Sequence, residues 1–225
     1  MLLAFAVPAS AGGINLAWDD CGAAGMQVKH FGCDSNAGID VLCASFSPPD
    51  TLRGVTGFEA RLDFCWPQVT SYWQLEPGAC RAGQLSAGTD PSDAPPACLT
   101  GWSSPDATIH QYALGNRAGR DASLIVNVSF QAPVTVTDDL EYFAFKAVLR
   151  HGKTVGSGAC AGCNQAVCIS FGDFVLTRPT AEQNDVRIQN PLNRHSVEWQ
   201  GTGNPYCCNV PIRATTWGTI KGLYR

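Results

Sequence analysis

The stretch EYFAFKAVLRHGKTVGSGACAGCNQAVCISFGDFVL, residues 141–176, decides the fold class of this chain. In its first half, apolar and polar residues alternate with the period of two that is typical of a half-buried strand. The apolar set consists of Phe143, Phe145, Ala147 and Leu149. Residues 167–171 alternate in the same way, after a glycine-rich turn that carries Cys160 and Cys163. The stretch therefore predicts two antiparallel strands joined by a cross-linked turn.

Two further segments carry the same alternation. Their apolar faces consist of Phe58, Ala60, Leu62 and Phe64 in residues 57–64, and of Leu124, Val126, Val128 and Phe130 in residues 123–131. Shorter strands are expected over residues 14–18, 39–46, 109–114, 186–188 and 196–200. Residues 65–107 are rich in Pro, Gly, Ser and Cys, and a loop of that length is expected to be cross-linked. We therefore predict an all-β protein, an antiparallel β-sandwich with long disulfide-stapled loops.

The two ends of the chain have their own patterns. Residues 1–11, MLLAFAVPASA, are typical of the end of a signal peptide with an A-x-A cleavage site, although the basic start is missing. An apolar first strand is the alternative. Residues 215–225 change to helical spacing, which predicts a short C-terminal helix packed on the sandwich. We expect residues 12–225 to form a single disulfide-bonded domain that is secreted, without a membrane span.

Composition narrows the function classes. Charged residues make up 15% of the chain and the formal net charge is −4. Because there is no basic run or Arg-rich face, the electrostatic signature of a nucleic-acid partner is missing. Hydrophobic residues at 45% are ample for a core. The chain is thus expected to be a globular extracellular domain that relies on uncharged polar residues for its surface.

The eleven cysteines are the strongest compositional signal. They are Cys21, Cys33, Cys43, Cys65, Cys80, Cys98, Cys160, Cys163, Cys168, Cys207 and Cys208. In an oxidising compartment such cysteines form cross-links that stabilise the fold by about 2–4 kcal/mol each. Structural zinc and redox use of the C-x-x-C pair are the alternatives. We predict disulfides, with one cysteine left over because the count is odd.

Cys207 and Cys208 are consecutive in the sequence, which limits how they can be bonded. A bond between them would close a strained eight-membered ring. They are therefore expected to reach two different partners and to tie the C-terminal segment to the core.

Two groups of residues are candidates for binding. Asp34, Asn36 and Asp40 place oxygen donors at the first, third and seventh positions of a loop, as calcium ligands are placed, although the usual glutamate is missing. An ordinary turn is the alternative. The aromatic residues Trp66, Tyr72, Trp73 and Trp102 crowd the long loop and are candidates for stacking on glycans or anchoring a partner. The alternative is that they cover disulfides and fill the core.

No catalytic motif stands out. The four histidines share no motif, and neither a nucleophile elbow nor a metalloprotease signature is present. No cofactor is implied.

Two resemblances follow from these residues. The order of residues 57–64, a long loop, residues 124–130 and a late strand pair resembles cohesin-type or carbohydrate-binding β-sandwich modules over residues 14–180. The C-x-x-C group together with the tail TWGTIKGLYR, residues 216–225, is similar to a group of secreted cysteine-rich bacterial proteins, and that resemblance implies no activity. Neither resemblance transfers a catalytic residue to this chain.

These observations lead to three functional hypotheses. The first is a non-enzymatic structural or adhesive protein that contacts other copies of itself or another cell-surface protein, as a subunit of a filament or surface layer. The second is a carbohydrate-binding module that uses exposed aromatic rings. The third is a secreted hydrolase, which requires a concave pocket with at least two convergent titratable groups.

Overall fold

The computed structural model describes residues 12–90, 92, 94–102, 105–117, 120–179 and 184–201. It contains eleven strands and one short 3₁₀ helix. They are β1 (Gly13–Trp18), β2 (Val28–Lys29), β3 (Ile39–Ser47), β4 (Leu52–Cys65), η1 (Ser71–Trp73), β5 (Leu85–Gly88), β6 (Pro105–Arg117), β7 (Arg120–Val136), β8 (Tyr142–Arg150), β9 (Val167–Thr177), β10 (Val186–Ile188) and β11 (Ser196–Trp199). The predicted signal peptide and C-terminal helix lie outside the described residues. No helical segment in the described ranges has the length and hydropathy of a membrane span.

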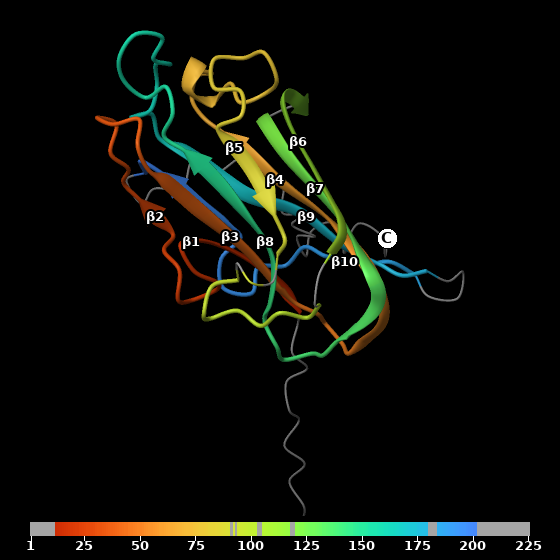
Figure 1. The fold of residues 1–225 in the computed structure, drawn as a ribbon. Helices are drawn as coiled ribbons and strands as arrows, with labels where there is room; N and C mark the ends of the chain where they lie inside the picture. Colours follow the sequence, from red (N-terminus) through yellow and green to blue (C-terminus); the bar gives the residue numbers. More distant parts are fainter. Residues whose placement is uncertain are drawn as a thin grey trace, which may run out of the picture.

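The strands form two sheets that lie face to face (Figure 1). The smaller sheet has the order β1-β3-β8-β5, and the larger one has the order β2-β11-β9-β4-β7-β6 with β10 added beside β9. All neighbouring strands are antiparallel except β2 and β11, which run parallel. The predicted fold class, an all-β antiparallel sandwich, is therefore confirmed.

The alternation in the sequence sets which face of each strand enters the core. The apolar sets predicted for β4 and β7 are all buried between the sheets. The apolar set of β8 departs from the prediction at one residue. A bulge lies opposite the step from Ala44 to Ser45, so Ala44 pairs with Phe145 whereas Ser45 pairs with Phe143. The extra residue turns Phe143 away from the main core and into a small cluster with Cys21 and Cys43.

Three long loops gather at one end of the sandwich (Figure 1). They are residues 30–38 before β3, residues 66–84 after β4, and residues 151–166 after β8. The antiparallel order explains this arrangement, because β3 begins at the end where β4 and β8 finish. We refer to these three loops together as the loop end.

Candidate functional site

Two disulfides join the loops of the loop end. Cys33 is bonded to Cys163 with a Cα–Cα distance of 5.8 Å, and Cys80 is bonded to Cys160 with a Cα–Cα distance of 6.1 Å. These bonds connect the middle loop, residues 151–166, to each of the other two. The predicted use of the C-x-x-C pair in disulfides is confirmed, because its two cysteines bond to separate loops rather than to each other.

The remaining cysteines complete the cross-linking pattern. Cys21 is bonded to Cys98, which fastens the long segment between β5 and β6 to the end of β1. Cys65 and Cys168 are also disulfide-bonded, and they are register partners across β4 and β9. Cys43 is a free thiol among the described residues. The cysteines at 207 and 208 lie outside the described residues.

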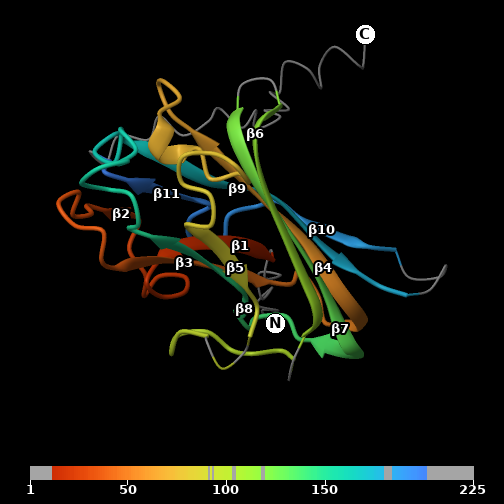
Figure 2. The ribbon, with the colours of Figure 1, turned by 45° about the horizontal axis from the view of Figure 1, so that its top comes forward.

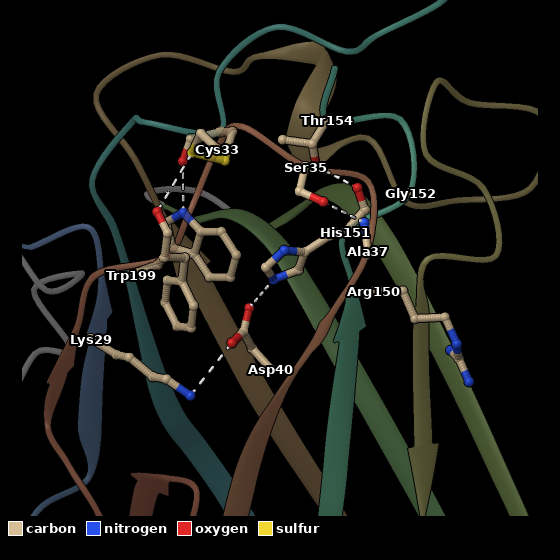
Figure 3. Close-up of polar contacts among 12 residues, drawn as sticks. Lys29, Cys33, Ser35, Ala37, Asp40, Arg150, His151, Gly152, Thr154 and Trp199 are labelled. Carbon is tan, nitrogen blue, oxygen red and sulfur yellow. Dashed lines mark hydrogen bonds and ion pairs between the residues drawn. A yellow bond between two sulfur atoms is a disulfide. The ribbon is translucent and has the colours of Figure 1, made fainter. Parts of the chain in front are cut away.

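An aromatic cluster fills the core beneath the loop end. Trp199 stacks on Phe31 with ring centroids 3.7 Å apart and meets Trp73 edge-on at 5.3 Å. Its Nε1 donates a 2.8 Å hydrogen bond to the carbonyl of Cys163 (Figure 3). The cluster therefore anchors the middle loop through both packing and a buried hydrogen bond.

The burial of these rings contradicts the hypothesis of an exposed aromatic surface and agrees with the alternative, that they fill the core. Trp66 is 7% exposed, Tyr72 and Trp73 are 0% exposed, and Trp102 is 5% exposed. The first three pack against one another, but Trp102 lies elsewhere in the core, where it stacks on Phe130 at 4.7 Å. Cross-linked loops fold these residues inward, so the rings contribute to the core and form no platform for a sugar.

A buried arginine holds the loop end together. Arg81 is 0% exposed, and its guanidinium lies 3.5 Å from the centre of the Tyr72 ring. It donates hydrogen bonds to the carbonyls of Tyr72 at 3.1 Å and Gly152 at 3.2 Å, and also to that of Arg150. Burial lowers the pKa of Arg81 below its usual range. Its fork of donors joins residues 66–84 to the end of β8.

A charged cluster lies beside this arginine, where β3 begins and β8 ends. The Nε2 of His151 lies 2.5 Å from Oδ2 of Asp40, while Lys29 Nζ lies 3.4 Å from Oδ1 of the same carboxylate (Figure 3). Lys29 also pairs with Asp19 at 2.6 Å. Asp40 is 6% exposed, so a carboxylate that would be costly to bury alone is matched by the Lys29 ammonium and by a ring nitrogen of His151.

The geometry of the His151–Asp40 pair bears on catalysis. The other ring nitrogen, Nδ1, faces Gly38, since a Cβ built there would lie 3.2 Å from it. Gly38 has a φ of 114°, which favours glycine and lets the backbone approach the ring closely. Of the two hydroxyls labelled in Figure 3, that of Ser35 accepts a hydrogen bond from the backbone N–H of Ala37, and that of Thr154 donates to the carbonyl of His151. The pair is thus arranged as an internal brace rather than as the base of a nucleophile.

Of the three residues proposed for calcium, Asn36 and Asp40 are engaged in other contacts. Asn36 Oδ1 accepts hydrogen bonds from the backbone N–H groups of Thr154 at 2.7 Å and Val155 at 3.0 Å. Asp40 is paired with Lys29 and His151, and Asp34 is exposed. Among the described residues, no group of three or more His, Cys, Asp or Glu side chains is placed to hold a metal ion. Asn36 instead fastens the middle loop to residues 30–38.

Two surface depressions carry titratable groups. A cleft of about 650 Å³ beside the loop end is lined by Glu76, His110 and Tyr112, and Tyr112 donates a 2.7 Å hydrogen bond to the carbonyl of Trp73. A more open depression of about 630 Å³ lies along residues 191–196 and includes Arg194 and His195. Burial lowers the pKa of His195 below its usual value.

Sequence reasoning missed the two polar elements that organise this end. Asp40 is separated from His151 by 111 positions, and Arg81 from Arg150 by 69. No local motif links such distant residues. The one usable signal was that Asp40 begins one expected strand, residues 39–46, and His151 follows another, but nothing in the sequence indicates that these two strands pair.

Comparisons with known proteins add little to this description. No protein-family model and no curated protein matches the chain. Among solved structures, a cohesin module from a family 33 glycoside hydrolase of Clostridium perfringens is similar, with 7% identity, a TM-score of 0.39, and coverage of 84% of this chain and 96% of that one. A type II cohesin domain from the cellulosome of Acetivibrio cellulolyticus has 11% identity, a TM-score of 0.32, and coverage of 84% and 95%. Both are cohesin modules, the family named by the weaker of the two sequence resemblances, but likeness at these values identifies no activity.

Proposed function

We propose that this protein is a secreted, non-enzymatic structural or adhesive module that acts through contacts between folded surfaces. Its partners are other copies of itself, assembled into a filament or surface layer, or another cell-surface protein. The observation that carries this proposal is the long edge strand β6, Pro105–Arg117, which is the last strand of the larger sheet (Figure 2).

The β6 edge is suited to pairing with another strand. Among the described residues β6 is the last strand in the order of the larger sheet, and no described strand pairs with its outer edge. Residues 107–115, ATIHQYALG, carry no Asp, Glu, Lys or Arg, whereas natural edge strands are often protected by such charges. His110 and Gln111 in the middle of this segment are exposed. A strand from a second protein would gain main-chain hydrogen bonds here.

The rest of the molecule supports a role that depends on rigidity. Disulfides fasten the loops, and the carboxylate of Asp40 is held by Lys29 and His151. A rigid scaffold with a free edge loses little entropy when it associates.

Assembly is tested on the oxidised full chain by size-exclusion chromatography with light scattering and by negative-stain imaging. Two single variants, His110→Pro and Gln111→Pro, distinguish loss of pairing at the outer edge from loss of fold stability. The backbone N–H groups of successive strand residues point to opposite edges of the strand, so the two prolines remove donors on opposite sides of β6. One proline removes an N–H that faces β7 and lowers the melting temperature, whereas the other removes only an outward N–H. The proposal predicts that the proline variant with the higher melting temperature no longer assembles.

Gln111→Ala is the control, because it changes the side chain and leaves the backbone donor in place. It should assemble like the unaltered chain. A chain that stays monomeric at every concentration and captures no surface protein contradicts the proposal, and a monomer that binds glycans favours the carbohydrate hypothesis instead.

A second function, hydrolysis of a small substrate, is favoured by one observation. Glu76 and His110 line the same cleft of about 650 Å³, and two titratable groups on one concave wall meet the minimum for acid–base chemistry. Screening ester, glycoside and peptide substrates with the unaltered chain and with Glu76→Gln tests it. Absence of turnover, or turnover that Glu76→Gln leaves unchanged, contradicts this assignment.

A further inference from the structure

The outer face of the larger sheet contains a buried polar patch. Its side chains belong to strands whose other face fills the core, so they point away from the core. The patch consists of Asp63 (0% exposed), Ser123 (5%), Ser170 (0%), Ser196 (7%) and Glu198 (6%). These residues are neighbours across β7, β4, β9 and β11, because Asp63 pairs with Ser123 and Ser170, and Ser196 pairs with Ser170. We call them the outer polar patch.

Burial at this patch is local rather than a property of the whole face. Farther along the same strands, Glu59, Asn127 and Ser129 point the same way and are exposed. A serine or aspartate side chain on the outer face of a sheet stays in contact with water unless another part of the chain covers that face. The outer polar patch therefore requires a covering layer that ends before Glu59.

Two cysteines mark the same place. Cys65 and Cys168 lie on the outer face beside the patch, are register partners, and are both disulfide-bonded. The other described cysteines are either joined in three pairs or, for Cys43, free. Cys65 and Cys168 are therefore bonded either to each other or to the two cysteines at 207 and 208.

The C-terminal segment, residues 202–225, has the reach and the chemistry to be the cover. It follows β11, the strand next to β9, and position 207 comes six residues after Gly201. Six extended residues span about 20 Å, and neighbouring strands are only about 5 Å apart. The segment carries three basic residues and no acidic one, whereas the patch contains the carboxylates of Glu198 and of Asp63, the latter already paired with Arg61 at 3.2 Å. Its apolar residues suit a buried layer.

We propose that residues 202–225 dock on the outer polar patch of their own chain, with Cys207 and Cys208 bonded to Cys65 and Cys168. Each bridge forms from two thiols, which lose two protons and two electrons to a disulfide donor of the export compartment, and that donor is reduced to a dithiol. The docked segment adds a covalently held layer on the sheet face opposite the core. This inference stands apart from the β6 edge and does not depend on it.

Counting free thiols in denatured, non-reduced protein tests the disulfides. The unaltered chain should give one alkylated thiol, Cys43, and Cys207→Ser/Cys208→Ser should give three, because Cys65 and Cys168 lose their partners. If Cys65 and Cys168 are bonded to each other, the double variant gives one thiol instead, and the proposal is wrong. Cys43→Ser is the control and should lower each count by one.

A measurement on the unaltered chain covers the case in which the double variant does not fold. Trypsin releases residues 195–213 as one peptide that contains both C-terminal cysteines. Non-reducing mass spectrometry should find this peptide linked to those that carry Cys65 and Cys168, in a monomer on a non-reducing gel. An unlinked peptide, or a disulfide-linked oligomer, overturns docking within one chain.

A steric pair tests the docking itself. Ser123→Arg should lower the melting temperature by several degrees, because the longer side chain would displace the docked segment. Ser129→Arg, on the same face of the same strand, is exposed and should leave it unchanged. Equal behaviour of the two variants contradicts a covering layer over the patch.

Discussion

The imidazole Nε2 of His151 lies 2.5 Å from the carboxylate Oδ2 of Asp40, across the end of the β3–β8 ladder at which the long loops gather. The backbone N–H of His151 also donates to the carbonyl of Gly38 at 3.1 Å. The side chain and the main chain of His151 thus both bind residues at the start of β3, at the same end of the β3–β8 ladder. This contact positions the middle loop, which in turn carries the cysteines of two disulfides.

The first prediction concerns this contact. Asp40→Asn should lower the free energy of unfolding by about 1–3 kcal/mol, because a neutral amide pairs less well with Lys29 and His151 in a buried place. Chemical denaturation measures the change. Asp34→Asn, in the exposed part of the preceding loop, is the matched control and should have no effect. Equal losses for both would mean that the ion pair does not stabilise the fold.

The second prediction concerns the buried guanidinium. Arg81→Lys should destabilise the protein by about 2–4 kcal/mol, because an ammonium cannot stack flat on Tyr72 and reach three carbonyls at once. Arg150→Lys is the comparison, since Arg150 is exposed and its side chain donates to Ser86. Thermal unfolding of both variants measures the loss of stability. If Arg81→Lys is destabilised no more than Arg150→Lys, the planar guanidinium with its several donors is not needed at position 81.

The third prediction concerns the free thiol. Burial, with smaller contributions from Asp20 and Asp19, raises the pKa of Cys43 to about 12. Iodoacetamide at pH 8 should therefore leave Cys43 unmodified in the folded protein and alkylate it in denaturant, because the thiolate is the reactive form. Mass spectrometry of the intact chain reads the result. Rapid alkylation of the folded protein would contradict the burial of this thiol.

The same thiol gives a dependence of stability on alkaline pH. Its folded pKa lies above the ordinary value of 9.0, so the folded state keeps a proton that the unfolded state releases. The stability from this group is complete below pH 9.0 and is lost progressively between 9.0 and about 12. Cys43→Ala should remove this part of the alkaline slope, which denaturation at a series of pH values measures.

The fourth prediction concerns acid. Burial lowers the pKa of His195 below its ordinary value of 6.5, so the unfolded state takes up a proton before the folded state does. The contribution of His195 is therefore present above pH 6.5 and is lost as the pH falls below it. His195→Gln should flatten the stability profile in that range, whereas His30→Gln, at an exposed position, should not.

The sandwich was predictable because alternation of apolar residues is a local property of each strand. Phe58 to Phe64 and Leu124 to Phe130 face the core as their sequence indicates. Phe143 is the exception, because a bulge depends on the partner strand and leaves no signal in the strand that contains it. Local pattern therefore predicts which residues enter the core, but not where the register slips.

The loop end was not predictable in the same way. Of the two interpretations of Trp73, the exposed binding residue is wrong and the core residue is right, because that ring packs against Trp199, which lies in a strand more than a hundred residues later. The pairing of Arg81 with carbonyls of β8 likewise depends on tertiary contacts alone. Cysteine content indicated that the loops are cross-linked, but only the folded chain shows which loops are joined.

The three bridges between described cysteines also overlap along the chain. Cys21–Cys98 and Cys33–Cys163 together enclose every position between 21 and 163, with Cys80–Cys160 nested inside. A single peptide bond hydrolysed anywhere in that interval leaves both fragments attached through sulfur. An extracellular protease that nicks an exposed loop would then produce a molecule of unchanged mass, apart from one added water, until a reductant separates the pieces.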